Sequence, residues 1–322
     1  MTGPRSFAHS PAMPLGDVPV PFASRGWQKK QEAESRLEKL VARFGDRMVR
    51  FSEDALGEEL DARIARIQMH PNEAGFDPFG FDPGTARYAL ALAAFLHRFY
   101  FRTEVFGVEH VPEGRVLIIA NHSGQIPMDG LIIGTSLMLD AEPPRFPRSM
   151  VERWSAELPF VSVFFPRCGQ VVGSPDNARR LLQNDEALVV FPEGTRGISK
   201  TFDKRYQLVD FGLGFMRLAL ETGTPIVPVS VVGGEEQLIS VADFKGVARL
   251  FGMPSFPIIP QLFLGMPFPL PTRYRLRFGP PMRFDGDPDD DDAVIGEKVA
   301  EVRANIQRMV DRGLEERRSI FW

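Results

Sequence analysis

Residues 115–130 read R-V-L-I-I-A-N-H-S-G-Q-I-P-M-D-G, and this stretch decides the fold. Residues 116–120 form a short, unbroken apolar run, which predicts a strand buried on both faces. The run ends at Asn121, where a polar loop begins. Because ligands in open α/β sheets bind at the carboxyl ends of the strands, the pattern predicts an α/β protein with a site in this loop.

The loop offers His122 and Asp129 as a candidate catalytic pair. Pro127 is placed to open the apolar run 131–139 as a helix, since a proline at the first helical position loses only an amide that has no partner there. Asp129 then falls in the first turn, where the helix dipole favours a carboxylate that can point back at the imidazole. Such a pair can take a proton from a hydroxyl at neutral pH. The alternative is a loop histidine without a catalytic role.

A second apolar run, residues 187–191, repeats this pattern and leads into F-P-E-G-T-R-G at residues 191–197. The loop combines an acid, a flexible backbone, a hydroxyl and a guanidinium, followed by a lysine: Glu193, Gly194, Thr195, Arg196 and Lys200. Arginine matches the geometry of phosphate oxygens, and glycine lets backbone amides approach closely. We therefore expect an anion-binding loop here, and the alternative is a solvated charge cluster.

The rest of the chain predicts a mixed, mostly parallel sheet flanked by helices. Further strands are expected at residues 103–108, 169–173, 225–232 and 274–278. Pro225 and Pro228 mark the start of the third of these and an edge or bulge within it, and the alternation in the fourth is typical of an edge strand. Helices are expected at residues 27–51, 53–68, 85–100, 177–183, 207–222 and 293–315.

Four segments follow from this pattern. They are a disordered N-terminus at residues 1–25, a helical extension with a proline- and glycine-rich linker at 26–84, the α/β domain at 85–285, and an acidic loop with a C-terminal helix at 286–322. The helical extension is expected to pack on the main domain or on a partner.

The composition is that of an ordinary folded protein, with 43% hydrophobic residues, 25% charged residues and a net charge of -4. This charge gives no indication of nucleic-acid binding. Cys168 is the only cysteine, which excludes an intrachain disulfide and a cysteine zinc cluster and favours a reducing compartment. The N-terminus shows no apolar signal core, and no apolar run free of helix breakers reaches the ~18 residues that a membrane-spanning helix needs.

Residues 250–272 contain no charged side chain, and six prolines interrupt their apolar residues. The prolines exclude a spanning helix, because they would leave backbone groups unpaired in hydrocarbon. Two interpretations stay open, a buried loop that covers the core and a monotopic face that rests in the lipid interface. We favour lipid contact.

Three motifs together resemble the phospholipid and glycerol acyltransferase family, which includes the lysophosphatidate acyltransferases. They are N-H-S-G-Q-I-P-M-D at residues 121–129, F-P-E-G-T-R at 191–196 and T-P-I-V-P-V at 224–229. The likeness covers roughly residues 95–281, and F-P-E-G-T-R is the most specific of the three.

The resemblance implies a role for each matching residue. His122 matches the general base that takes the proton from the acceptor hydroxyl as it attacks an acyl thioester, and Asp129 matches the acid that orients this histidine. The residues of the second motif, Glu193, Gly194, Thr195 and Arg196, match the acceptor-binding motif, with Arg196 nearest the phosphate. Pro225 and Pro228 match a motif associated with acyl-donor binding and packing. Further candidates for substrate contact are Ser123, Gly124, Gly169, Arg179, Arg180 and Lys200.

Two departures from the family pattern matter. The usual spacing is H-x4-D, whereas six residues separate His122 from Asp129, so Gln125 and Ile126 must bulge before Pro127 restarts the chain. The family's G-x-x-F-x-R motif also lacks its arginine, since Gly169 is followed by Q-V-V-G-S-P. Either Arg179 or Arg180 replaces it, or the acceptor lacks a phosphate.

The resemblance implies transfer of an acyl chain from acyl-CoA or acyl carrier protein to a glycerolipid hydroxyl, with lysophosphatidate as the first acceptor, no metal and no cofactor. The implied partner is a lipid at the cytoplasmic face of a membrane. Three alternatives stay open: a non-phosphate acceptor such as diacylglycerol, a non-catalytic lipid-binding protein, and an acyl hydrolase that uses Cys168 with His122.

Overall fold

The computed structural model describes residues 50, 59–67, 77–151, 161–244, 246, 248, 256–264 and 268–321. The chain divides into two compact units, residues 1–43 and 44–322, and all described residues lie in the second. The predicted disordered segment 1–25 and most of the predicted helix 27–51 lie outside the described residues.

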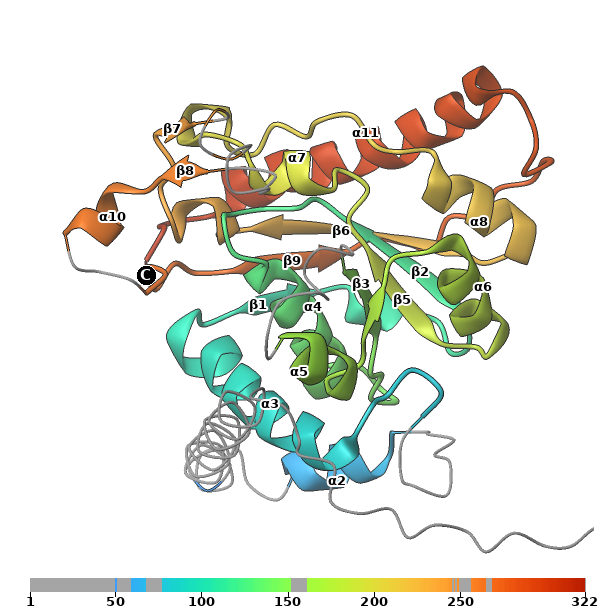
Figure 1. Ribbon diagram of the computed structural model, residues 1–322, viewed down its shortest axis with the longest axis horizontal. Helices are drawn as coiled ribbons and strands as arrows, with labels where there is room; N and C mark the ends of the chain where they lie inside the picture. Colours follow the sequence, from blue (N-terminus) through green and yellow to red (C-terminus); the bar gives the residue numbers. More distant parts are fainter. Residues whose placement is uncertain are drawn as a thin grey trace, which may run out of the picture. The chain divides into compact units, whose positions relative to one another are not determined.

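A seven-stranded sheet with the order β1-β9-β6-β2-β5-β3-β4 forms the centre of this unit (Figure 1). Its strands are β1 (Glu104–Phe106), β2 (Val116–Ala120), β3 (Arg148–Val151), β4 (Gln170–Val172), β5 (Ala187–Val190), β6 (Ile226–Val232) and β9 (Arg275–Phe278). Neighbouring strands pair in parallel except β6 and β9, which pair antiparallel. The predicted α/β class with a mixed, mostly parallel sheet is confirmed.

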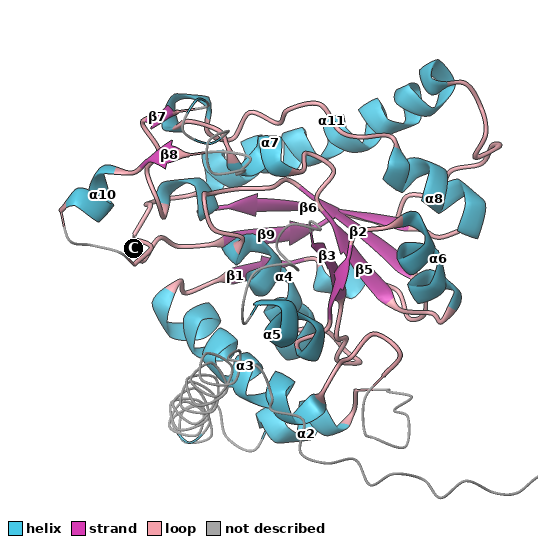
Figure 2. Ribbon diagram, viewed as in Figure 1, coloured by secondary structure: helices cyan, strands magenta, loops and turns pink. Residues whose placement is uncertain are grey.

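β2 is central, and all five of its residues are buried, as its unbroken apolar run predicts. Alternate side chains enter different cores because successive residues of a strand point to opposite faces. Leu117 and Ile119 pack in the core that also contains side chains of α6 (Pro175–Gln183), α8 (Gly214–Thr222) and α11 (Asp292–Glu316). Ile118 packs in the other core, which includes α4 (Met128–Leu139). Figure 2 shows the sheet between these helices.

The remaining elements are short or lie at the margins of the sheet. The helices are α2 (Glu59–Ala65), α3 (Pro83–Phe95), α5 (Val161–Arg167), α7 (Thr195–Ile198) and α10 (Pro260–Phe263). A π-helical turn, η1 (Leu96–Tyr100), continues α3, and 3-10 turns occur at Val108–His110, Phe202–Lys204 and Gly234–Glu236. A separate two-stranded sheet pairs β7 (Ala242–Asp243) with β8 (Pro257–Ile258).

The C-terminal helix α11 belongs to the same core as the sheet. Its buried stripe is Ile295, Val299, Val302, Ile306 and Val310. These side chains share one hydrophobic cluster with Leu117 of β2 and Val232 of β6. The helix therefore covers one face of the sheet.

The predicted helix at residues 207–222 is wrong in its first half, because α8 begins only at Gly214. The backbone N–H and carbonyl of Leu208 form hydrogen bonds with side chains of α11 instead of with neighbouring turns of a helix. The Leu208 N–H donates to the side chain of Gln307, and Arg303 donates to the carbonyl of Leu208. Side chains of α11 thus hold this segment in an irregular conformation, which its apolar spacing did not reveal.

Two predictions about the edges of the sheet are also wrong: that residues 274–278 form an edge strand, and that Pro228 marks an edge or bulge. β9 lies between β1 and β6, and its alternation arises because Arg275 and Arg277 form ion pairs with Glu316 while the alternate side chains are buried. Pro228 lies in β6, an interior strand between β9 and β2. The chain after β9 leaves the ladder opposite this proline, where Gly279 donates to the Pro228 carbonyl. The sheet therefore accommodates Pro228 by a break in its neighbour.

Candidate active site

The loop between β2 and α4 brings the predicted catalytic pair together. Nδ1 of His122 lies 2.7 Å from Oδ2 of Asp129, and the same oxygen accepts the Ser123 N–H at 2.8 Å. Pro127 precedes α4, and Asp129 falls in the first turn of this helix. The start of the helix therefore brings Asp129 next to His122, although six residues separate the two in sequence. The Asp129 carboxylate is fully buried.

This geometry assigns the Nδ1 proton of His122 to the bond with Asp129, because a carboxylate at this distance accepts a hydrogen bond. Nε2 then carries a lone pair, and no other described side chain binds it. The imidazole stacks on the ring of Phe191, with centroids 4.2 Å apart and planes at 19°. His122 is held on one side by a carboxylate and on one face by an aromatic ring, which fixes the orientation that a general base requires.

Asn121 fixes the start of the loop. Its side-chain amide donates to the Val231 carbonyl at 3.0 Å and accepts from the Val231 N–H at 2.8 Å. Both bonds are buried and tie the end of β2 to the end of β6. The position of His122 therefore depends on the sheet as well as on its own loop.

Glu193 connects the second motif to the first. The His122 N–H donates to Oε1 of Glu193 at 2.9 Å, and the Val209 N–H donates to Oε2 at 3.0 Å. Only 2% of Glu193 is exposed, and the Lys200 ammonium lies 3.6 Å from Oε2. Both carboxylate oxygens are occupied by the protein itself. Glu193 therefore positions the backbone of His122 and Val209, and its carboxylate is not available to bind the acceptor.

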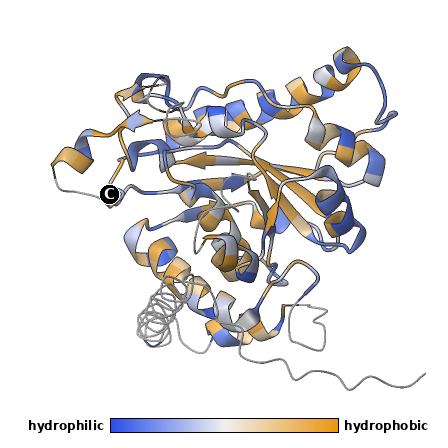
Figure 3. Cartoon of the chain, in the orientation of Figure 1, coloured by the Kyte–Doolittle hydropathy of each residue, from blue (hydrophilic) through white to orange (hydrophobic). Residues whose placement is uncertain are grey.

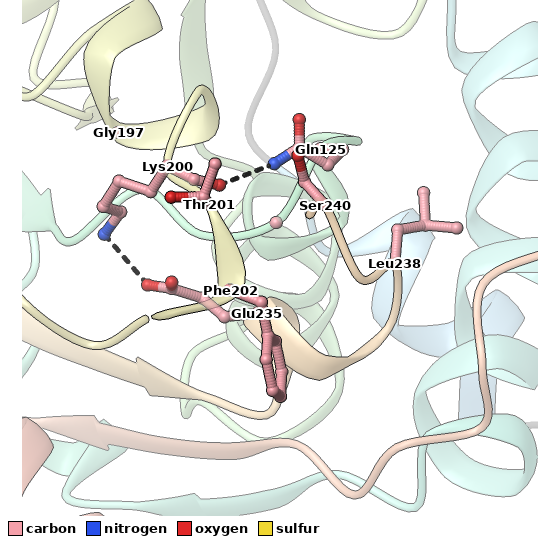
Figure 4. Close-up of a pocket in the computed structure, with 9 residues that line it drawn as sticks. Gln125, Gly197, Lys200, Thr201, Phe202, Glu235, Leu238 and Ser240 are labelled. Carbon is pink, nitrogen blue, oxygen red and sulfur yellow. Dashed lines mark hydrogen bonds and ion pairs between the residues drawn. The ribbon is translucent and has the colours of Figure 1, made fainter. Parts of the chain in front are cut away.

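Lys200 is buried in an ion pair with Glu235, with 2.9 Å between Nζ and Oε1 (Figure 4). Burial raises the pKa of Glu235, and the neighbouring ammonium opposes this rise. Gln125 donates to the Lys200 carbonyl at 3.0 Å, so the pair also borders the histidine loop. The small pocket beside it is lined by Gly124, Gln125, Gly197, Lys200, Thr201, Phe202, Glu235, Leu238 and Ser240.

The rest of the second motif lies at the surface beside the histidine loop. Gly194 has a φ of 56° and is followed by α7, which begins at Thr195. The Arg196 side chain is exposed and makes one hydrogen bond, of 2.9 Å, to the Asp210 carbonyl. Gly197 packs directly against His122, since a Cβ at this glycine would lie 2.7 Å from the His122 Cβ. Arg196 therefore keeps donors for an acceptor group.

Several predicted substrate residues lie elsewhere. Arg179 in α6 is paired with Asp176 and Glu221, and Arg180 is exposed on the same helix. Gly169 and Pro225 precede β4 and β6, at the amino ends of these strands, whereas His122 follows the carboxyl end of β2. The structure does not bring these residues to the histidine loop.

Gln237 is a residue of the site that sequence reasoning missed. It is fully buried, its Nε2 donates to the Ile126 carbonyl in the histidine loop at 3.2 Å, and its Oε1 accepts from the Tyr274 hydroxyl at 3.0 Å. No signal in the sequence indicates that this glutamine reaches the histidine loop.

Cys168 does not have the properties of a nucleophile. Burial raises the pKa of its thiol to about 12, and the nearby Asp82 adds to the rise. A thiol with such a pKa is protonated at neutral pH, whereas the thiolate is the reactive form. Cys168 also directly precedes Gly169 at the amino end of β4. The Cys168 hydrolase alternative therefore loses its chemical basis.

Comparison with known proteins identifies the family of the chain. The family model described as Acyltransferase matches residues 102–232, a range that includes His122, Asp129 and Glu193. Uncharacterized protein Rv0502 of Mycobacterium tuberculosis is 38% identical over 285 residues, which span 84% of this chain and 80% of the relative. The chain belongs to the acyltransferase family.

More distant relatives carry descriptive names. The probable 1-acyl-sn-glycerol-3-phosphate acyltransferase of Mycoplasma pneumoniae is 28% identical over 44% of this chain and 53% of its own length. The DGAT1/2-independent enzyme synthesizing storage lipids of Gallus gallus is 23% identical over 65% of this chain and 59% of its own length. The solved structure of the lysophosphatidate acyltransferase PlsC from Thermotoga maritima aligns with 87% of this chain and 99% of that chain, at 19% identity and a TM-score of 0.48.

Proposed function

We propose that this acyltransferase moves a fatty acyl chain from acyl-CoA or acyl carrier protein to a hydroxyl of a glycerolipid, with lysophosphatidate as the first acceptor. The observation that carries the proposal is the 2.7 Å contact between His122 and Asp129 at the carboxyl end of β2. It leaves Nε2 of His122 as the base for the acceptor hydroxyl.

The reaction proceeds in two proton transfers. Nε2 of His122 takes the hydroxyl proton as the oxygen attacks the thioester carbonyl, and the Asp129 carboxylate stabilises the imidazolium that forms. Collapse of the tetrahedral intermediate breaks the carbon–sulfur bond, and the imidazolium returns the proton to the departing thiolate. General base catalysis of this kind contributes about 100- to 10,000-fold in rate.

Arg196 supports a phosphate-bearing acceptor, because it is exposed beside the histidine loop and has donors to spare. A neutral acceptor such as diacylglycerol is the second candidate. Arg179 and Lys200 were predicted to contact the substrate, but each is already paired with a carboxylate. Neither therefore supports a phosphate on the acceptor, which favours the neutral candidate. The relatives named as storage-lipid enzymes agree with this candidate.

The test is release of free CoA from a long-chain acyl-CoA by the purified full chain, with liposomes that carry lysophosphatidate, diacylglycerol or no acceptor. We expect release that requires an acceptor, a loss of at least about 100-fold in His122→Ala and a loss of similar order in Asp129→Asn. Acceptor-independent release would instead indicate a hydrolase. No release with any acceptor or donor would favour a lipid-binding protein.

Arg196→Gln separates the two acceptors. If lysophosphatidate is the substrate, this variant raises its KM by about tenfold or more, because a charge-assisted hydrogen bond to phosphate is lost. Arg180→Gln is the matched control, since Arg180 is also exposed but lies on α6. An unchanged KM for lysophosphatidate, together with activity on diacylglycerol, would assign the neutral acceptor.

A further inference from the structure

Four apolar side chains protrude from the end of the fold that contains α10. Phe263 is 80% exposed, Phe268 75%, Leu264 72% and Leu262 50%. We call these four residues the apolar platform. Figure 3 shows α10 as a hydrophobic element at the left margin of the view. Side chains of this size are rarely left in water in such a group without a binding role.

The sequence on either side of the apolar platform carries positive charge. The uncharged segment 250–272 is bracketed in sequence by Arg249 and Arg273, and Arg273, which is ion paired with Glu104 at 3.0 Å, keeps 37% of its side chain exposed. Arg102 lies against the same segment and donates to the Pro271 carbonyl at 2.5 Å. Cations next to an uncharged apolar segment are the pattern by which proteins bind anionic lipid headgroups and bury apolar side chains beneath them.

The apolar platform is connected to the histidine loop through two glutamines. Nε2 of Gln261 in α10 donates to the Gln237 carbonyl at 3.1 Å, and its Oε1 accepts the Ile239 N–H at 2.7 Å. The Gln237 side chain in turn donates to Ile126, four residues after His122. On the other side, the Tyr100 hydroxyl donates to the Pro269 carbonyl at 2.6 Å. The platform is therefore anchored to the part of the protein that holds the base.

We propose that the apolar platform inserts into the surface of a bilayer that contains anionic lipid and thereby presents the histidine loop to an acceptor lipid in that bilayer. The proposal rests on the proposed function, because a glycerolipid acceptor resides in a membrane. A bilayer fits better than a protein partner, since the segment offers aromatic and aliphatic side chains bracketed by cations and no charged side chain of its own. No helix among the described residues is long enough and apolar enough to cross a bilayer.

The first test measures binding without any substrate. The full chain is sedimented with vesicles of zwitterionic lipid alone or with added anionic phosphatidylglycerol, and Phe263→Ser/Leu264→Ser is compared with the wild type. We expect stronger binding to the anionic vesicles and a fall of at least about tenfold in the partition coefficient of the double variant, since two large apolar side chains no longer leave water. Both side chains are exposed, so the fold does not depend on them. Val294→Ser is the control, because Val294 is also exposed but lies at the start of α11.

The second test separates docking from catalysis. A short-chain acceptor that stays monomeric in water should be acylated equally by the wild type and the double variant, whereas an acceptor in vesicles should be acylated at least about tenfold more slowly by the double variant. Equal vesicle binding by both proteins overturns the docking proposal. So does a wild-type dimer that dissociates in the double variant, because the apolar platform would then bind a second copy. Wild-type protein that binds vesicles but transfers no acyl chain overturns the proposed function alone.

Discussion

The backbone N–H of His122 donates its hydrogen bond to the buried carboxylate of Glu193, across 71 positions of sequence. The two motifs that follow β2 and β5 are therefore one structural unit. Because β2 and β5 are paired in parallel, their carboxyl ends lie side by side and the loops that follow them can meet. Glu193 of F-P-E-G-T-R fixes the histidine loop through this hydrogen bond, whereas Arg196 of the same motif is exposed.

Replacing Glu193 should lower kcat more than it changes the KM for the acceptor. Glu193→Ala leaves the His122 and Val209 N–H groups without acceptors, which costs about 3 kcal/mol of unfolding free energy and releases the histidine loop. Glu193→Gln keeps one acceptor oxygen and should be less severe in both respects. Steady-state kinetics and urea unfolding measure the two effects. A KM that rises while kcat is unchanged would mean that Glu193 contacts the acceptor directly.

Adding one methyl group at Gly197 should inactivate the enzyme without touching a reacting atom. The new Cβ would lie 2.7 Å from the His122 Cβ and 2.9 Å from the Glu193 Cβ, so Gly197→Ala must displace His122, the base in the proposed mechanism. We expect kcat to fall about 100-fold, since small errors of position cost this much. Gly296→Ala is the matched control because its Cβ meets no atom within 4 Å. It should raise the unfolding free energy by about 0.5–1 kcal/mol through helix propensity. Full activity in Gly197→Ala would show that the loop tolerates displacement.

Cys168→Ser should retain activity within about twofold, because a thiol whose pKa is raised to about 12 by burial supplies no thiolate at neutral pH. Alkylation of the native protein by iodoacetamide should be slow for the same reason and become fast in urea. The measurement is CoA release beside mass spectrometry of the alkylated chain. Loss of activity with an intact fold would restore the hydrolase alternative.

The stability of the protein should fall in mild acid because of His97. Burial, with a smaller contribution from Arg98, lowers the pKa of His97 to about 3. The unfolded chain binds a proton at this histidine below pH ~6.5, while the folded protein does not, so the unfolding free energy decreases as pH falls from ~6.5 towards 3. The expected loss between pH ~7 and ~5 is about 2 kcal/mol.

His97→Gln removes this titration and keeps a hydrogen-bond donor for the Ser136 hydroxyl, which lies 2.9 Å from Nε2. Urea unfolding at pH ~7 and pH ~5 measures the effect. The fall in unfolding free energy between these two pH values should be about 2 kcal/mol smaller in the variant than in the wild type. An equal fall in the two proteins would mean that His97 is not the group responsible.

The parts of the fold that local chemistry determines were predictable from the sequence. The unbroken apolar run of β2 predicts a strand buried on both faces, and the apolar stripe of α11 predicts a helix with one buried face, so the types of both elements follow directly from the sequence. The contact of His122 with Asp129 was also predictable, because a proline and a helix start lie between them.

The parts that depend on distant partners were not predictable. The sequence predicted that Glu193 binds the acceptor, and only the fold shows that its carboxylate accepts hydrogen bonds from the His122 and Val209 amides. The irregular segment before α8 has a helical pattern, but Arg303 and Gln307 of α11 supply its hydrogen bonds. In each case the deciding group lies far away in sequence, where periodicity carries no information.

The order of strands in the sheet has a consequence for synthesis of the chain. β1 pairs with β9, and the two are separated by about 170 residues, so β1 lacks this partner until β9 has left the ribosome. The helix that covers one face of the sheet, α11, is made later still. During translation the nascent enzyme must therefore carry an unpaired edge and an uncovered apolar face, the state in which chaperones bind and in which growing chains aggregate. β9 and α11 thus decide whether the loops after β2 and β5, which are made earlier, fold into a stable site.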